Sequence, residues 1–378
     1  ETSGSGSHSM GILPAEVKNA VKNAARHTKE RVRDAKARAL TTVGSQPRGL
    51  GRRMKGMFSN PVSPGADPWV IRHGDSYLWC YANAANTKIY INSFSDLHGP
   101  YGQSHVVFRA PADGPCSREV WAPELHFLDG RFYIYFAASD GNNANHLAYV
   151  LQSETADPLG PYTLHGPLAT GDGHGPLEFV WAIDMTILNL HGRRYAVWSG
   201  WDAPGSDRQF LYIAPMLDPL TLAGPRVCLC NNASYPWELT EEHGAGSRGL
   251  NEGPQILQHE GRTFIVYSCG ASWLSTYKLG MLELMGPNPL DPRCWRKHPA
   301  PVFESAGDTI GVGHSCFVAS PDMKELWHVY HAKTTIVPGW DDRKIFMQPL
   351  HFAKDGFPMF GSPLQKGELQ AAPSGSGR

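Results

Sequence analysis

The chain has 378 residues, and 34 Lys and Arg stand against 35 Asp and Glu, which gives a formal net charge of −1. Only 18% of the residues are charged, 11% are aromatic, and there are 40 Gly and 30 Pro, so a disordered chain, a fibrous chain and a helical bundle are excluded. The balanced charge argues against an obligate polyanion binder, and no apolar run reaches the roughly 18–20 residues that a membrane span needs.

The N-terminal part is predicted to differ from the rest. Residues 1–13 are expected to be a tag remnant or disordered, and residues 14–58 a basic extension with one helix over 14–43. Residues 16–55 hold 12 Lys or Arg and 3 Asp or Glu, a net charge of +9, so the other residues hold 22 and 32, a net charge of −10. The helix could lie on its own acidic domain, join two copies of the chain, or bind nucleic acid or a membrane surface. We keep the homo-oligomer contact as an expectation and predict no nucleic-acid partner.

The seven cysteines do not form a disulfide pattern, because their number is odd and most lie in apolar, strand-like runs. Cys228 and Cys230 lack neighbours at the spacing of zinc ligands. The Asn232-Ala-Ser234 sequon is too short a pattern to indicate a compartment. The odd count and the lack of a signal-peptide core favour a cytoplasmic protein over a secreted one.

A β pattern recurs from residue 59 to 370. Each copy has a short apolar strand, a polar turn and a strand of aromatic and β-branched residues, and five copies leave room for two further strands each. Four-stranded units repeated in this way form a propeller. The sequence therefore predicts an all-β, five-bladed β-propeller with an N-terminal α-helical extension and a short tail at 371–378. The turns fall at Gly74, Gly130, Gly192 and Gly261 and near Lys324.

Each copy begins with an ionisable residue where an apolar one is expected. A single such residue could merely cap a turn, but the first strand of every propeller blade lines the axis, so five of them converge on one pocket. Carboxyls gathered there repel one another, which separates their pKa values and lets one site hold both a general acid and a general base. The five residues are Asp67, Glu124, Asp184, Glu252 and His314.

Aromatic side chains flank these positions. Flat sugar faces stack on such rings while hydroxyl groups bond to acids, so the pocket suits a carbohydrate. Two carboxyls on either side of a glycosidic bond are the minimum for its hydrolysis. For any one Trp, packing in the core is the competing interpretation. The flanking residues are Trp69, Trp121, Phe179, Trp181, Trp198, Trp201, Trp237 and Trp273.

From about residue 64 to about 362 the chain resembles glycoside hydrolase family 43, whose members are five-bladed propellers. The resemblance implies that Asp67 is the general base, Glu252 the general acid, and Asp184 the carboxylate that tunes and orients the acid. The segments that carry it are Ala66-Asp67-Pro68-Trp69-Val70, Trp181-Ala182-Ile183-Asp184-Met185-Thr186 and Asn251-Glu252-Gly253-Pro254.

Further segments extend the resemblance. Glu119-Val120-Trp121-Ala122-Pro123-Glu124-Leu125 implies that Glu124 lines the sugar pocket. Gly313-His314-Ser315 implies that His314 lies beside calcium or another cation, through water, although no cofactor is required. Arg343 resembles a pocket arginine near the acid. The expected substrate-binding residues are Trp69, Trp121, Glu124, Trp181, Trp201 and Arg343.

The stretches REVWAPELHF, WAIDMT, NEGPQIL and GVGHS are most similar to those of exo-acting α-L-arabinofuranosidases of the family. The resemblance implies an inverting exo-glycosidase that removes terminal α-L-arabinofuranosyl residues from arabinan or arabino-oligosaccharides. Inversion requires about 6.5–9.5 Å between the two carboxyls, to admit a water. A β-xylosidase or another pentosidase or furanosidase of the family is the alternative. A non-catalytic glycan-binding propeller is the alternative of another class.

Overall fold

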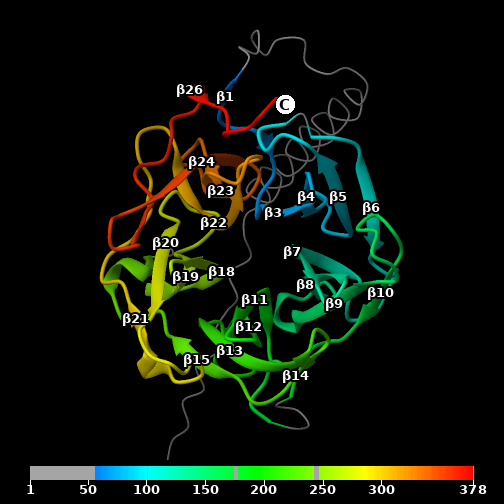
Figure 1. The fold of residues 1–378 in the computed structure, drawn as a ribbon. Coiled ribbons are helices and arrows are strands. Elements are labelled where there is room, and N and C mark those ends of the chain that lie inside the picture. The colour runs from blue at the N-terminus through cyan, green and yellow to red at the C-terminus, as the bar shows by residue number, and fades with distance from the viewer. Residues whose placement is uncertain (1–55, 100, 174–177, 242–246, 378) are drawn as a thin grey trace, which may run out of the picture. The chain divides into compact units, whose positions relative to one another are not determined.

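The computed structural model describes residues 56–99, 101–173, 178–241 and 247–377. Strands dominate, with three short 3-10 helices, and no α-helix occurs in these ranges. Figure 1 shows the strands grouped in five blades around a central axis. The prediction of an all-β, five-bladed propeller is therefore confirmed.

In blades 1 to 4 the inner strand is the first strand of the blade in sequence. In blade 5 the inner strand is the first of three consecutive strands, and a strand from the N-terminal side of the chain pairs with the last of them. Blade 1 contains β3 (Trp69–His73), β4 (Ser76–Ala82), β5 (Lys88–Phe94) and β6 (Ser104–Arg109). Blade 2 contains β7 (Arg118–Leu128), β8 (Arg131–Ser139), β9 (Leu147–Ser153) and β10 (Tyr162–His165). Blade 3 contains β11 (Ala182–Leu190), β12 (Arg193–Trp201), β13 (Gln209–Asp218) and β15 (Val227–Cys230), and β14 (Thr221–Leu222) pairs with β13.

Blade 4 contains β18 (Asn251–His259), β19 (Arg262–Cys269), β20 (Lys278–Leu284) and β21 (Trp295–Lys297). Blade 5 contains β22 (Ile310–Ala319), β23 (Leu326–Lys333) and β24 (Lys344–Phe352), and β2 (Ser63–Pro64) and β25 (Pro358–Met359) both pair with β24. A separate hairpin joins β16 (Leu239–Glu241) to β17 (Ser247–Gly249). The 3-10 helices are Asn143–Asn145, Pro236–Glu238 and Pro292–Cys294.

The two ends of the described chain pair with each other, β1 (Met57–Ser59) with β26 (Leu369–Ala371). Both belong to one compact unit, Met54–Arg378. The helix predicted over 14–43, and the oligomer contact expected through it, lie outside the described residues. The domain boundaries predicted from the sequence stay predictions.

Tight turns join the inner hairpins of blades 2, 3 and 4. In each turn a non-glycine residue and the following glycine both have positive φ, as in Asp129 (50°) and Gly130 (78°). Two successive positive φ values define the type I′ turn, whose twist matches that of paired strands. Three of the turn glycines predicted from the sequence thus occupy the second position of such a turn, and the fourth, Gly74, also has a positive φ (59°) that favours glycine. The other two pairs are His191-Gly192 and Glu260-Gly261.

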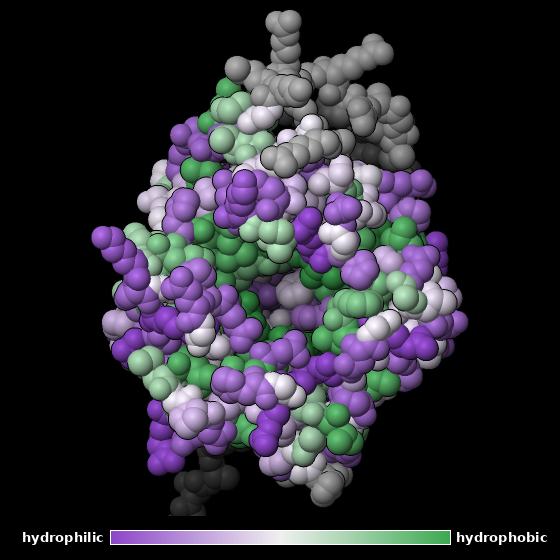
Figure 2. All heavy atoms as spheres, in the orientation of Figure 1, coloured by the Kyte–Doolittle hydropathy of each residue, from purple (hydrophilic) through white to green (hydrophobic). Residues whose placement is uncertain are grey.

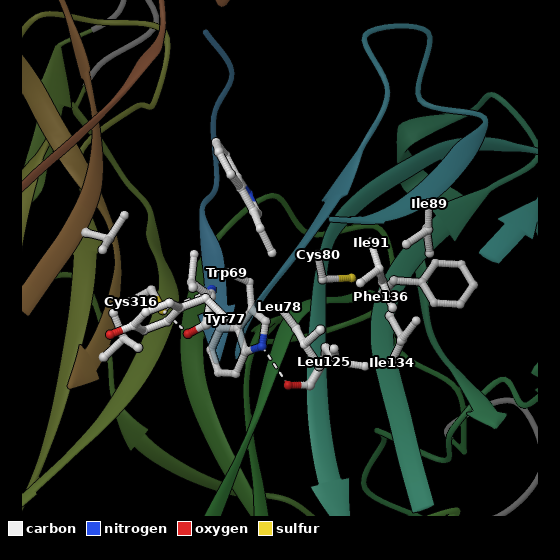
Figure 3. Close-up of a cluster of buried hydrophobic side chains, with 14 of the residues drawn as sticks. Trp69, Tyr77, Leu78, Cys80, Ile89, Ile91, Leu125, Ile134, Phe136 and Cys316 are labelled. Carbon is white, nitrogen blue, oxygen red and sulfur yellow. Dashed lines mark hydrogen bonds between the residues drawn. The ribbon is translucent and has the colours of Figure 1, made fainter. Parts of the chain in front are cut away.

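Apolar side chains fill the spaces between blades. In Figure 3, Trp69, Leu78 and Ile91 of blade 1 lie beside Leu125, Ile134 and Phe136 of blade 2. Trp69 Nε1 donates a hydrogen bond of 2.7 Å to the Leu125 carbonyl oxygen, which joins the two blades. Each fully buried large apolar side chain contributes about 1.5–3 kcal/mol to folding. The packing makes the inner strands a rigid frame for the residues at their ends.

Each blade has a left-handed residue at or just before the start of its inner strand, and β7 and β22 each carry a second one, Glu119 (φ 53°) and Gly311 (57°). Strand pairing skips register at these points in β7, β11, β18 and β22, which marks a β-bulge in each. In blade 1 the corresponding residue lies just before β3. Bulges re-aim the neighbouring side chains. The residues are Asp67 (φ 50°), Ala122 (40°), Asp184 (55°), Gly253 (54°) and His314 (51°).

The bulges correct one part of the sequence prediction. Asp67, Asp184 and His314 occupy equivalent positions, but Glu252 comes one residue before its bulge residue and Glu124 two residues after. The five ionisable residues are therefore not in one register. They occupy different positions along the strands relative to the left-handed residue of each blade.

Candidate active site

Figure 2 shows a hollow at the centre of the ring, with both apolar and polar residues around it. The starts of the inner strands bring the three predicted acids together. Gly253 N, next to Glu252, donates a hydrogen bond of 2.9 Å to Asp184 Oδ2. Asp67 acts electrostatically on both Asp184 and Glu252. The three carboxyls thus belong to one site.

Asp67 is surrounded by nitrogen atoms. Its Oδ1 lies 3.0 Å from Arg343 Nη1, 3.2 Å from His331 Nδ1 and 3.4 Å from His314 Nδ1. Burial alone would raise the pKa of Asp67, but Arg343 and the two histidines outweigh it and hold that pKa well below its usual range. Burial lowers the pKa of His331 to about 4 and also lowers that of His314, so the permanent charge is that of Arg343. Asp67 is therefore a carboxylate at neutral pH.

Glu252 has the opposite environment. Burial raises its pKa, and the negative charge of Asp67 raises it further. Two hydrogen bonds oppose this rise, one of 2.8 Å from Tyr277 Oη to Oε1 and one of 3.2 Å from Gln209 Nε2 to Oε2. The net effect keeps Glu252 protonated at higher pH than an exposed glutamate.

Asp184 is only 4% exposed. Burial raises its pKa well above the ordinary value, and the charges of Glu252 and Asp67 add to this, whereas the Gly253 N–H lowers it. Asp184 and Glu252 therefore form a neighbouring pair that holds a proton more tightly than either would in water.

Glu124 lies deeper than the other acids, with 1% of its surface exposed. Its Oε1 accepts a hydrogen bond of 2.5 Å from Gln255 Nε2, and its Oε2 lies 3.1 Å from His126 Nε2. Burial raises the pKa of Glu124 and lowers that of His126 to about 3. Both oxygens are thus held by protein groups, and contact with a sugar stays a prediction.

His314 was predicted to lie near a cation. No group of three or more His, Cys, Asp or Glu side chains able to hold a metal occurs among the described residues. Calcium takes six to eight oxygen ligands, so an ion beside His314 would keep water for most of them. The water-mediated cation therefore stays a prediction.

The predicted aromatic residues occupy different environments. Trp69 is 9% exposed and belongs to the core, which favours packing over sugar contact. Trp181 and Trp201 stack with ring centroids 4.9 Å apart and are 6% and 5% exposed. Trp121 is half-buried and stacks on His146 at 3.8 Å. Their contacts with substrate stay predictions.

Several residues at the site were not predicted. Tyr277 and Gln209 hold Glu252, and His331 holds Asp67. They lie away from the inner strands, Tyr277 just before β20, Gln209 at the start of β13 and His331 on β23. Arg343 was expected near the acid. It acts electrostatically on Glu252, but its hydrogen bond goes to Asp67.

The chain is similar to several known proteins. It is 30% identical over 345 residues to an extracellular exo-α-(1→5)-L-arabinofuranosidase of Streptomyces avermitilis, covering 88% of this chain and 69% of that one. It is 32% identical to the enzyme of the same name from Streptomyces chartreusis, covering 79% and 89%. The crystal structure of an α-L-arabinofuranosidase from Lactobacillus brevis matches with a TM-score of 0.74 and 30% identity, covering 82% of this chain and 98% of that one.

The predicted preference for a cytoplasmic protein is wrong, because both Streptomyces relatives are named extracellular enzymes. The odd cysteine count misled because Cys80, Cys116, Cys269 and Cys316 are buried free thiols. Such residues behave as small apolar side chains and say little about redox compartment. Within the described ranges, no helix is long and apolar enough to cross a membrane.

The profile of the glycosyl hydrolases family 43 matches residues 58–358, most of the chain. This span includes every blade and all three predicted acids. The same family is indicated by the segments found in the sequence, by the five blades and by the relatives at about 30% identity. The chain belongs to glycoside hydrolase family 43, and it is a glycoside hydrolase.

Proposed function

We propose that this protein is an inverting exo-glycosidase that removes terminal α-L-arabinofuranosyl residues from arabinan or arabino-oligosaccharides. The observation that carries the mechanism is the pair of opposite pKa shifts, lowered at Asp67 and raised at Glu252. The names of the Streptomyces and Lactobacillus relatives, all α-L-arabinofuranosidases, support α-L-arabinofuranose as the sugar that is removed.

In the proposed mechanism Glu252 protonates the glycosidic oxygen as the bond to the anomeric carbon breaks. Asp67 accepts a proton from a water that attacks that carbon from the opposite face, so the configuration inverts. Asp67 keeps 25% of its side chain exposed, which leaves it within reach of water. Exchange of one proton with solvent restores both groups.

The surrounding residues have supporting roles. Arg343 keeps Asp67 ionised and ready to accept a proton. Asp184 accepts the Gly253 N–H and so lies against the segment that carries Glu252. Like-charge repulsion within this pair favours the protonated acid near neutral pH.

Product analysis tests the reaction. Proton NMR during hydrolysis of linear arabinan should show arabinose released from chain ends with inverted anomeric configuration. Glu252→Gln should lower kcat/KM by about 10²- to 10⁴-fold on a substrate with a poor leaving group. Nearly full activity in this variant would refute the assignment of the acid.

A panel of aryl pentosides separates the alternatives. Faster turnover of xylosides than of arabinofuranosides would indicate a β-xylosidase or another pentosidase of the family. Binding of arabino-oligosaccharides without any product would indicate a glycan-binding propeller. We also propose a cation beside His314, which a calcium titration tests. A homo-oligomer contact through residues 14–43 is a further proposal, which light scattering tests.

A further inference from the structure

Two loops that are distant in sequence meet at the edge of the active site. One precedes β20 and carries Trp273, and the other joins β23 to β24 and carries Trp340. The two indole rings pack edge to face, with centroids 5.3 Å apart and an interplanar angle of 67°. Gly339 N donates a hydrogen bond of 2.9 Å to the Trp273 carbonyl, and Trp340 Nε1 donates one of 3.2 Å to Ser272 Oγ. The pair is therefore held in a fixed geometry.

The loop that carries Trp340 also holds further exposed apolar side chains. Trp340 is 56% exposed, and Ile336 and Val337 on the same loop are 77% and 65% exposed, while Trp273 is half-buried. Exposed large apolar groups that cluster in this way mark binding surfaces more often than isolated ones do. We call the surface of Trp273, Ile336, Val337 and Trp340 the rim platform.

The rim platform is continuous with the proposed catalytic groups. The Trp340 carbonyl accepts hydrogen bonds from Arg343 N (3.3 Å) and Arg343 Nε (3.4 Å), and the same guanidinium binds Asp67. Trp273 comes four residues before Tyr277, whose hydroxyl donates to Glu252. One loop thus leads to the proposed base and the other to the proposed acid.

We propose that the rim platform binds the part of an arabino-oligosaccharide that lies beyond the cleaved bond, on the leaving-group side. This inference rests on the proposed function. A terminal arabinofuranosyl unit that reaches the carboxyls on the axis leaves the rest of its chain at the rim. The aromatic and aliphatic groups there offer faces for apolar sugar surfaces, as carbohydrate sites require.

The test compares substrates that have and lack a second sugar. Trp340→Ala and Trp273→Ala should each lower kcat/KM on arabinotriose about tenfold more than on an aryl arabinofuranoside, and Trp340→Phe should restore most of the loss. The control is Met285→Ala, because Met285 is also 56% exposed and follows the far end of β20. Equal losses on both substrates, or no loss on arabinotriose, would overturn the proposal.

Further measurements separate sugar binding by the rim platform from an indirect effect on the catalytic groups. If Trp340→Ala acts only by displacing Arg343, the low-pH limb of its kcat/KM profile moves, and the proposal fails. Ile336→Ser changes the platform at a side chain that is 77% exposed, and it should also affect arabinotriose more than the aryl substrate. If the wild type releases no arabinose, the proposed function fails. Binding of arabinotriose then tests the rim platform by itself. Weaker binding in the Trp variants than in the wild type and Met285→Ala would support sugar binding by the platform, and unchanged binding would overturn it.

Discussion

Asp67 and Glu252 would have similar pKa values in water, and only their neighbours in the protein make these pKa values differ. Asp67 faces a guanidinium and two imidazoles, whereas Glu252 is half-buried beside another carboxyl, and its hydrogen bonds from the described residues come from neutral groups. A permanent positive charge stabilises a carboxylate more than neutral donors do. Exchanging single neighbours should therefore move each pKa separately.

Tyr277→Phe tests the environment of the acid. The variant loses the hydroxyl that donates to Glu252 but keeps the ring that stacks on His331 at 5.4 Å. That hydrogen bond favours ionised Glu252, so its loss should raise the pKa of Glu252. The high-pH limb of kcat/KM, where the acid loses its proton, should then move to higher pH. Tyr267→Phe, which loses a comparable bond to Glu238, is the control, and a shift to lower pH would contradict the assignment.

Arg343→Gln tests the environment of the base. Without the guanidinium the pKa of Asp67 should rise, because Arg343 is the main group that lowers it. The low-pH limb of kcat/KM, where the base becomes protonated, should then move to higher pH. The control is Arg194→Gln, since Arg194 forms a two-bond ion pair with Asp129 outside the site. An unchanged low-pH limb in Arg343→Gln would mean that Asp67 is not the base.

At this scale the sequence identifies carboxyls better than the residues that hold them. Asp67, Asp184 and Glu252 stand out because each begins a copy of the repeat, at a point where an apolar residue is expected. Tyr277 and Gln209 give no such signal, because aromatic and polar residues are common near strand ends. The side chain of Asn232 also shows the limit of a motif, because it is 4% exposed and its Nδ2 donates to the carbonyls of Gln209 and Gly249. The glycosylation sequon therefore marks a buried structural amide.

At the scale of the strand, the bulge determines which residues face the axis. Proline follows the left-handed residue in three blades, at Asp67-Pro68, Ala122-Pro123 and Gly253-Pro254. Proline has no N–H for the ladder and is tolerated in sheets at bulges. These prolines are a sequence signal for the correct register, which the alignment of ionisable residues missed. Strand order alone could not predict that Glu252 lies one residue before the left-handed residue of its blade and Glu124 two residues after that of its own.

Gly253→Ala tests the bulge that carries the acid. Gly253 has a φ of 54°, and an added Cβ would lie 3.1 Å from His314 Nδ1. Gly261→Ala is the matched control, because its φ is 78° but its Cβ would meet nothing within 4 Å. Both variants should lose roughly 1–2 kcal/mol of stability to the left-handed backbone.

Activity should separate these two variants. Only Gly253→Ala should displace Glu252 and His314, so only this variant should lose kcat/KM, on the order of tenfold to a hundredfold. Thermal unfolding and steady-state kinetics on the same samples provide the comparison. Equal kinetics in the two variants would show that the bulge position does not control the acid.

At the scale of the whole molecule, the ring is closed by strands from both ends of the described chain. β2 pairs with β24 as the outer strand of blade 5, and β1 pairs with β26. The spacing of the turns predicted the number of blades, since each inner hairpin has its own signal. It could not predict the closure, because β2 has two residues and no hydrophobic alternation that would mark a strand.

Asn60 links this closing segment to blade 5 through its side chain. The side chain is almost fully buried, its Nδ2 donates to the Met347 carbonyl at 2.9 Å, and its Oδ1 accepts from Met347 N at 2.9 Å. The amide thus occupies both backbone groups of one residue of β24, as a paired strand would. Asn60→Ala leaves both groups buried without partners, and each costs about 1–3 kcal/mol.

Asn60→Ala should therefore lower the Tm by several degrees while kcat/KM at 25 °C stays close to the wild-type value, because Asn60 bonds to none of the proposed catalytic groups. Thermal unfolding and kinetics on the same samples measure both effects. Ser63→Ala, in the adjacent β2, is the control, since among the described residues its hydroxyl bonds to the neighbouring Pro64 carbonyl alone. A wild-type Tm in Asn60→Ala would show that backbone pairing alone closes the ring. A large loss of activity without a loss of Tm would show that the closing segment instead positions the site.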